Sequence, residues 1–386
     1  MTNPIFRQLQ QCLDQYSVGF PATASGIEIQ ILERLFSVSD ARVFLQMSPK
    51  LETPEAIAPR IGMDAASAIA ILADMADRGL LFSLKKNGAI RYGAIPFVHG
   101  LFEFQIIRMD REFASLVRRY MDERFNEAMS ASAANFLRVV PVQKSIDPRS
   151  RVAPYEDAIQ ILEKAGQIVV ADCVCRKSNA ALGQGCGKPL EVCFMFGSMG
   201  QYYLDHGMGR RIDLPEAARI LTDAHEHGLV TQPATSQNPS GMCNCCGDCC
   251  GPLTSLKHHP KPAAMVFANY FARVDEDLCT GCETCLERCQ MEAVIMEEDH
   301  AMVNGDRCIG CGLCVSTCPS GALSLERKPE KAQPEIPKNQ MEAHAMRIKV
   351  REQARADLGD RLTKRRGAGL RPAGTLGPED TPLKWY

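Results

Sequence analysis

No long apolar run occurs anywhere in this sequence of 386 residues. A membrane-spanning helix needs about 18 consecutive apolar residues, and a secretory signal needs a basic segment followed by an apolar one. The chain contains no such apolar stretch, and its first thirty residues contain no such signal. We therefore expect a soluble, cytoplasmic protein without a membrane span.

The chain also lacks an excess of charge of either sign. Its 44 Lys and Arg residues nearly balance 46 Asp and Glu residues, which leaves a formal net charge of −2. Such a chain offers nucleic acid or an anionic membrane no overall attraction. The phosphate-binding patterns GxxxxGK, followed by Ser or Thr, and strand-linked GxGxxG are absent too, so we expect no bound nucleotide.

Cysteine is what the sequence holds in excess, and its distribution is uneven. Of the 18 cysteines, all but Cys12 lie between residues 173 and 318. In a reducing cytosol, such cysteines are more often metal ligands or catalytic thiols than disulfides. Dispersed structural cysteines would not gather in tight groups, so the pattern predicts metal sites in this part of the chain.

The first 99 residues predict a small helical domain that ends in a hairpin. Apolar side chains recur at helical spacing over residues 27–37 and 41–47. A further helix is expected to start at Thr53 and Pro54, and another is expected to run from an Asp64 cap to a glycine stop. The segments LLFSL and AIRYGAI, separated by a polar KKNG turn, predict the hairpin.

This order of elements resembles the winged-helix domain over roughly residues 26–97. The resemblance implies DNA binding through the helix that follows Asp64. That helix carries Asp74 and Asp77 against a single Arg78, and an acidic helix is repelled by phosphate. We therefore expect a structural or dimerising role, and no nucleic-acid partner.

The next segments lead towards the cysteines. Residues 100–136 carry apolar side chains at helical spacing, which predicts one long amphipathic helix. Residues 155–166 and 214–228 then repeat a pattern of a helix that stops at a glycine, and each is followed by a short apolar strand. Each of these two units delivers the chain to a cysteine group.

The strongest motif is a cysteine run that occurs twice. Residues 279–289 read CTGCETCLERC and residues 308–319 read CIGCGLCVSTCP. Two residues separate the first three cysteines of each run, and three more precede the fourth. The run resembles that of the bacterial two-cluster ferredoxin domain over about residues 270–326, which implies two [4Fe-4S] clusters and single-electron transfer.

In that family the fourth cysteine of each run binds the cluster held by the other run. Gly281 and Gly310 suit a close approach of the backbone. Gln290 departs from the family pattern, which usually has Pro there. Zinc held by four thiolates would not explain the fourth cysteine of both runs. Carried over to this sequence, one cluster is held by Cys279, Cys282, Cys285 and Cys318, and the second by Cys308, Cys311, Cys314 and Cys289.

The middle region holds nine more cysteines, and the segment CNCCGDCC contains five of them. Cys243, Cys246 and Cys249 stand in the every-third-residue register of a cubane loop, so Cys245 and Cys250 are expected to point elsewhere. Metal ligation is expected among these nine residues: Cys173, Cys175, Cys186, Cys193, Cys243, Cys245, Cys246, Cys249 and Cys250.

The number of middle clusters stays open at this point. Two cubanes would use eight of the nine thiols, whereas a single cluster would leave the others structural or redox-active. Zinc and a cysteine-based redox catalyst are further alternatives. Arg176 and Lys177, beside Cys175, would lower the thiol pKa values and offset cluster charge. We expect at least one further iron-sulfur cluster here.

The fold class expected from these segments is α+β with several domains. The winged-helix-like start, DCVCR, SGMCNCC and the two ferredoxin runs together resemble a group of iron-sulfur proteins from anaerobic bacteria, which implies an architecture but no substrate. The expected divisions are a winged-helix-like domain at 1–99, a long helix and linker at 100–140, a cysteine-rich iron-sulfur domain at 141–265, a ferredoxin-like two-cluster domain at 266–328 and a charged tail at 329–386, in which 340–366 form an exposed helix.

The leading hypothesis is an electron-transfer protein with two ferredoxin-type clusters and one or two more. Its partners would be a redox protein that gives or takes electrons, a larger anaerobic oxidoreductase complex, or a second copy of the chain. Two alternatives belong to other classes. One is a redox-sensing transcription factor, and the other is an iron-sulfur enzyme or reductive activator whose middle cluster has an open iron site.

Overall fold

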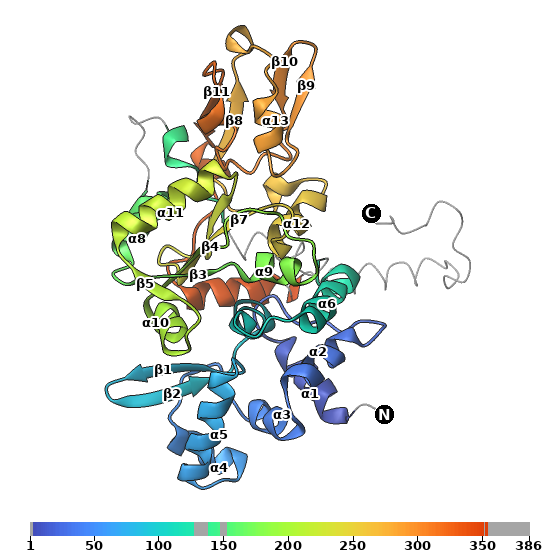
Figure 1. The fold of residues 1–386 in the computed structure, drawn as a ribbon, viewed down its shortest axis with the longest axis vertical. Helices are drawn as coiled ribbons and strands as arrows, with labels where there is room; N and C mark the ends of the chain where they lie inside the picture. The colour runs from blue at the N-terminus through green and yellow to red at the C-terminus, as the bar shows by residue number, and fades with distance from the viewer. Residues whose placement is uncertain (1–2, 127–137, 147–152, 351, 354–386) are drawn as a thin grey trace, which may run out of the picture.

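The computed structural model describes residues 3–126, 138–146, 153–350 and 352–353. It has three parts stacked along the long axis of the molecule (Figure 1). Helices and one hairpin form the N-terminal part, a five-stranded sheet with its helices forms the middle, and two small sheets form the C-terminal part. The fold is mixed helix and strand, as the sequence predicts.

The predicted helices and hairpin of the N-terminal part are present. Asp64 caps a helix by accepting a hydrogen bond from the Ser67 amide, and Pro54 occupies the first turn of the helix before it. The elements are α1 (Pro4–Leu13), α2 (Ile27–Leu35), α3 (Val38–Leu45), α4 (Pro54–Ile61), α5 (Ala65–Asp77), and the antiparallel strands β1 (Phe82–Lys86) and β2 (Ala89–Gly93).

Among the described residues, no single helix is long and apolar enough to cross a bilayer. Helices α4 and α5 together meet the length and composition of a span, but they are bent by 100° from each other.

The single long helix predicted over residues 100–136 is wrong. Gly100 departs from helical geometry, with φ −170° and ψ −108°, and Asp110 accepts a hydrogen bond from the Phe113 amide and so starts a new helix. Residues 127–136 lie outside the described part. The observed pieces are π-helical η1 (Phe97–Leu101), 3-10 helical η2 (Glu103–Gln105), α6 (Arg111–Tyr120) and π-helical η3 (Met121–Phe125).

The middle part is an antiparallel sheet with the strand order β5-β3-β4-β7-β6. Helices α8 and α11 lie on one face and α10 lies on the other (Figure 1). The strands are β3 (Ile168–Asp172), β4 (Glu191–Phe196), β5 (Arg210–Ile212), β6 (Val230–Pro233) and β7 (Gly241–Cys245). The helices are α8 (Ala158–Lys164), α9 (Val174–Ala181), α10 (Gly197–Asp205), α11 (Leu214–Glu226) and α12 (Gly251–His258).

Strand alternation divides the side chains of this sheet between two cores. Val170, Phe194 and Met242 pack against α8 and α11. Val169 and Ala171, on the opposite face, share a core with α10 and the N-terminal part. Because successive strand residues point to opposite faces, Cys193 and Cys243 lie on the α10 face. We call this side the cysteine face.

The C-terminal part consists of two antiparallel hairpin-like pairs and a short helix. Its elements are β8 (Tyr270–Val274) paired with β11 (Leu323–Arg327), β9 (Val294–Glu297) paired with β10 (His300–Val303), and α13 (Thr284–Arg288). Short 3-10 turns complete the described chain: η5 (Gln143–Ser145), η6 (Pro154–Glu156), η7 (Pro262–Ala264), η8 (Glu276–Leu278), η9 (Val315–Thr317) and η10 (Glu330–Ala332).

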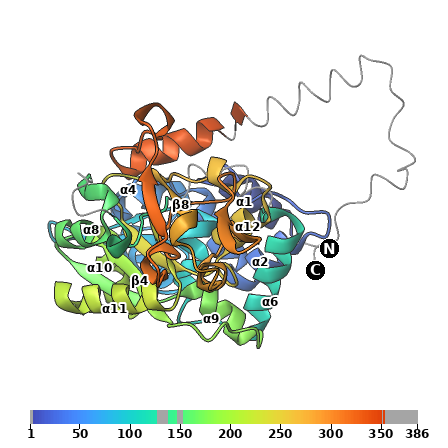
Figure 2. The ribbon, with the colours of Figure 1, turned by 90° about the horizontal axis from the view of Figure 1, so that it is seen from above.

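The helix expected from residue 340 is present over residues 340–350, and most of its residues are exposed, but this segment also contacts distant parts of the chain. Residues 340–350 are helical and run along one side of the molecule (Figure 2). Ala343 and Arg347 are buried, and Arg347 donates a hydrogen bond to the Ser17 hydroxyl. The Gln237 amide donates to the Pro337 carbonyl. These contacts with distant segments hold a stretch that composition alone marks as solvated; residues 354–366 lie outside the described part.

Tyr202 joins the middle part to the N-terminal part. It is fully buried on α10, and its hydroxyl lies 3.0 Å from the carbonyl oxygens of both Ala76 and Leu81. We expect Tyr202→Phe to lower the free energy of unfolding by about 1 kcal/mol, because a buried hydrogen bond is lost while the ring stays. Urea denaturation measures this change.

Thr222→Ala serves as the control, since its exposed hydroxyl bonds only within its own helix. This variant should change the free energy of unfolding by less than about 0.5 kcal/mol. Equal stabilities of Tyr202→Phe and the unsubstituted protein would contradict a role of the hydroxyl in joining the two parts.

Candidate metal centres

Two cavities in the C-terminal part are each lined by four cysteines. The structure brings together the same two sets that the spacing predicts, and ligation by them stays a prediction. Cys282 is exposed, whereas Cys285, Cys308 and Cys314 are buried. The first cavity is lined by Cys279, Cys282, Cys285 and Cys318, and the second by Cys289, Cys308, Cys311 and Cys314.

Backbone amides point at several of these sulfur atoms. The amides of Ala301, Ala272 and Ala293 donate to the Sγ atoms of Cys279, Cys308 and Cys289, at 3.4, 3.3 and 3.1 Å. Such bonds favour the thiolate form and tune the potential of a bound cluster.

The backbone also comes close where the sequence predicts it. Gly281 has a φ of 65°, and a Cβ atom there would lie 2.6 Å from the carbonyl oxygen of Asp299. All eighteen cysteines belong to the described part, and none of them forms a disulfide. Four free thiols, amide donors and tightly wrapped backbone around each cavity fit a [4Fe-4S] cubane.

The nine middle cysteines separate into two groups. The larger group is a closed ring in which each thiol lies near enough to the next to shift its pKa. Strands β4 and β7 supply three members, and the starts of helices α9 and α12 supply the rest. In order around it, this six-thiol ring consists of Cys173, Cys175, Cys250, Cys245, Cys243 and Cys193.

The ring members alternate in acidity. Hydrogen bonds from their neighbours lower the pKa values of Cys173 and Cys243 and bring the pKa of Cys250 to about 6. The same hydrogen bonds raise the pKa values of the members between them, Cys175, Cys193 and Cys245. A metal that bound these six sulfur atoms would displace the protons that the thiols carry without it.

Arg176 supplies positive charge between the two groups. Its guanidinium is buried, donates to the Asn244 carbonyl at 2.9 Å and lies 3.9 Å from Cys246 Sγ. Burial alone would lower its pKa, but the charges of Cys173 and Cys193 raise it above the usual range. The predicted charge compensation by Arg176 therefore has a geometric basis.

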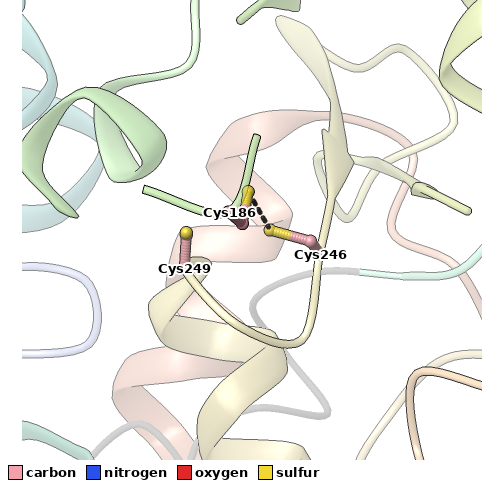
Figure 3. A group of neighbouring side chains, drawn as sticks. All are labelled: Cys186, Cys246 and Cys249. Carbon is pink, nitrogen blue, oxygen red and sulfur yellow. Dashed lines mark hydrogen bonds between the residues drawn. The ribbon is translucent and has the colours of Figure 1, made fainter. Parts of the chain in front are cut away.

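The smaller group is a triad of Cys186, Cys246 and Cys249, whose sulfur atoms lie within 4.8 Å of one another (Figure 3). The Sγ atoms of Cys186 and Cys246 are 3.8 Å apart. A hydrogen bond from Cys249 lowers the pKa of Cys246 to about 5. An ion pair of 3.0 Å between Lys188 and Asp248 ties the two loops together.

This partition corrects the predicted cubane register of Cys243, Cys246 and Cys249. Strand β7 continues to Cys245, so Cys243 and Cys245 both point to the cysteine face and join the ring. The chain turns only afterwards and carries Cys246 and Cys249 to Cys186. Thiolates around one tetrahedral zinc ion stand about 3.8 Å apart, so the triad has the spacing of ligands to a single metal ion.

Gln290 links the C-terminal clusters to the triad. Its side-chain oxygen accepts a hydrogen bond of 2.7 Å from the amide of Gly247. Gln290 directly follows Cys289, and Gly247 directly follows Cys246. The departure from the family's usual Pro therefore connects a cysteine of the second cavity with a cysteine of the triad.

Sequence reasoning missed a mostly apolar cavity beside the six-thiol ring. His99, Glu103, Tyr203 and Gln232 line it together with Cys193 and Cys243. The four residues that are not cysteines come from three separate regions of the chain, and none of these four belongs to a motif. The only local signal is the polar Gln232 in strand β6, whose four residues are all buried.

A family model described as a 4Fe-4S dicluster domain matches residues 272–325. No curated protein and no solved structure matches the chain. The matched segment contains all eight cysteines that line the two C-terminal cavities. With the cysteine-rich middle part, this match defines an iron-sulfur protein that can transfer electrons. Its C-terminal part is a 4Fe-4S dicluster domain, and [4Fe-4S] clusters are its cofactors.

The separation of the ring from the triad can be tested by serine substitutions. We expect Cys249→Ser to reduce the metal bound at the triad and Cys175→Ser to reduce that at the ring, because their thiols belong to different groups. Metal and sulfide content, together with the electron paramagnetic resonance spectrum of anaerobically purified protein, measures both losses.

Cys12→Ser is the matched control, because Cys12 lies in the N-terminal part and its thiol donates to the Tyr16 hydroxyl at 3.6 Å. This variant should keep the full metal content. Loss of one and the same resonance signal in Cys249→Ser and Cys175→Ser would instead mean that the nine thiols form a single site.

Proposed function

We propose that the protein relays single electrons from its two C-terminal clusters to the metal sites of the middle part. It would do so as a subunit of, or a partner to, an anaerobic oxidoreductase. The contact between Gln290 and Gly247 is the observation that carries this proposal. It supports a path because electron transfer is favoured where two redox sites are joined by few bonds.

The contacts between the parts give the relay an order. The cavity that contains Cys289 is the one that faces the middle part: the Val142 amide donates to the Cys311 carbonyl, and Ser145 donates to the Gly312 carbonyl at 2.6 Å. The cavity that contains the exposed Cys282 is the other one. Electrons would therefore enter or leave at the Cys282 side and pass by the Cys289 side to the triad and the ring.

Bound clusters would supply the one-electron chemistry, and the residues of the chain set its conditions. Amide donors such as that of Ala293 stabilise the reduced, more negative state at each sulfur. Arg176 offsets negative charge between the ring and the triad. Both effects raise the reduction potential of the site that they contact.

The proposal includes a structural role for the winged-helix-like N-terminal part, in docking to a larger complex or in forming a homodimer of a cytoplasmic protein. Arg78, the cation that follows α5, is already paired with Asp40 at 2.8 Å and with Asp74 at 2.6 Å. These ion pairs disfavour contacts of Arg78 with DNA phosphate. A gel shift with anaerobic protein distinguishes this role from that of a redox-sensing transcription factor.

The link through Gln290 can be broken by restoring the family's usual residue. We expect Gln290→Pro to slow electron transfer from the C-terminal clusters to the middle sites, because the hydrogen bond to Gly247 is lost. Rapid mixing with a low-potential reductant, followed by freeze-quenched electron paramagnetic resonance, measures how fast the middle signals appear.

Gln290→Glu is the control, since it keeps an oxygen acceptor for the Gly247 amide and should keep the rate. Iron content should be the same in both variants. If the middle signals of Gln290→Pro appear as fast as those of the unsubstituted protein, the proposed route is wrong.

A further inference from the structure

A cavity of about 90 Å³ lies where the N-terminal part covers the cysteine face of the sheet. His99, Glu103 and Phe104 line it from the N-terminal side. Gln232 and the thiols of Cys193 and Cys243, two neighbours in the six-thiol ring, line it from the sheet. Cavities between two parts of a protein, with a few convergent polar groups, are common binding sites for small molecules.

The sheet register places an amide beside the ring. Gln232 on β6 is paired with Cys243 on β7, and residues directly opposite each other point to the same face. Gln232 is fully buried. Neither its side-chain nitrogen nor its oxygen has a hydrogen-bond partner among the described residues.

A buried amide with both of its atoms unsatisfied costs stability, and native proteins rarely keep one. The neighbouring backbone adds a second unusual feature, because His99 holds a φ of 59°. Such strain in a residue that is not glycine is found mostly at functional sites. Together these features indicate that the cavity is shaped for a partner that the protein does not itself supply.

The lining residues define the chemistry of that partner. The described residues of the cavity wall include the carboxyl residues Glu103 and Asp172 but no Lys or Arg, so an anion would find no counter-charge there. Gln232 offers a donor and an acceptor side by side, and the matching group presents an acceptor and a donor in the same way. Carboxamides have this arrangement, and they are uncharged.

We propose that this cavity binds a small, uncharged molecule with a carboxamide-like group, which pairs with the Gln232 amide next to the Cys193 and Cys243 thiols. The proposal rests on the proposed function, since it places the ligand at the end of the electron relay. It also gives the N-terminal part a role, because that part builds half of the binding site.

A surface groove adjoins the cavity. The groove has a volume of about 820 Å³ and shares Met199 and Ser240 with the cavity wall. Residues 339–341, at the start of the C-terminal helical segment, form part of the groove's rim. The packed C-terminal segment thus borders the groove that adjoins the cavity.

Acetamide is the probe for the test, and acetate, which has the same size but a negative charge, is its control. Unpaired electrons on a metal site speed the relaxation of nearby protons. In the reduced holoprotein we expect the methyl protons of acetamide to relax faster than those of acetate. Equal relaxation of the two probes would overturn the proposal.

Gln232→Met keeps the shape of the side chain and removes its polar atoms. We expect this variant to lose the excess relaxation of acetamide, to keep the resonance spectrum of its clusters, and to unfold at a higher temperature, because an unsatisfied amide is gone. The matched control is Gln10→Met, whose buried amide donates to the Phe20 carbonyl at 2.6 Å and is not part of the cavity wall. It should keep the acetamide effect and unfold at a lower temperature.

Two results would contradict the proposal. One is unchanged acetamide relaxation in Gln232→Met, which would mean that the amide only fills space. The other is a changed cluster spectrum in this variant, which would mean that the metal site itself occupies the cavity. If Gln232→Met fails to fold, Tyr203→Phe provides a second variant at the cavity wall. The comparison of acetamide with acetate needs no variant.

The rate of electron delivery to the middle sites is measured separately. A failure of the proposed relay is therefore distinguishable from a failure of ligand binding.

Discussion

Alternation of side chains along strand β7 is the constraint on which the metal sites depend. Cys243 and Cys245 leave the strand on the cysteine face, and Asn244 between them leaves it on the other. Asn244 donates to the Val192 carbonyl and accepts from Thr231, so this part of the strand cannot slip or rotate without breaking buried hydrogen bonds. The two cysteines are thereby directed to the ring and kept from the triad.

Charge is the second constraint, because many thiols are packed together in a buried region. Interactions between neighbouring thiols lower the pKa of Cys173 and raise that of Cys175. Arg176 adds a buried cation whose position is held by the Asn244 carbonyl. Asn244 therefore serves both constraints, because its side chain fixes strand β7 and its backbone carbonyl holds Arg176. A shift of this residue would disturb both.

The sequence predicts the C-terminal part well because its information is local. Each cysteine run is short, and its resemblance to the runs of the two-cluster ferredoxin domain implies which four thiols meet. The partition of the middle cysteines depends instead on the pairing of β4 with β7, which joins residues some fifty positions apart. The broken helix near Asp110 and the buried Arg347 were also missed, because a cap and a long-range contact overrode helical and charged patterns. Gln232 could not be recognised, since its neighbours come from distant segments.

The glutamine that follows Cys289 has a consequence for how such modules can be exchanged. A free-standing two-cluster carrier with Pro at this position could have the same fold. It would lack the glutamine side chain that accepts a hydrogen bond from the Gly247 amide. Grafted in place of residues 266–328, such a carrier would bring its own cluster ligands but not this hydrogen bond. On the proposed relay, the residue after the fourth cysteine thus separates a dicluster unit that is matched to its host from one that is not.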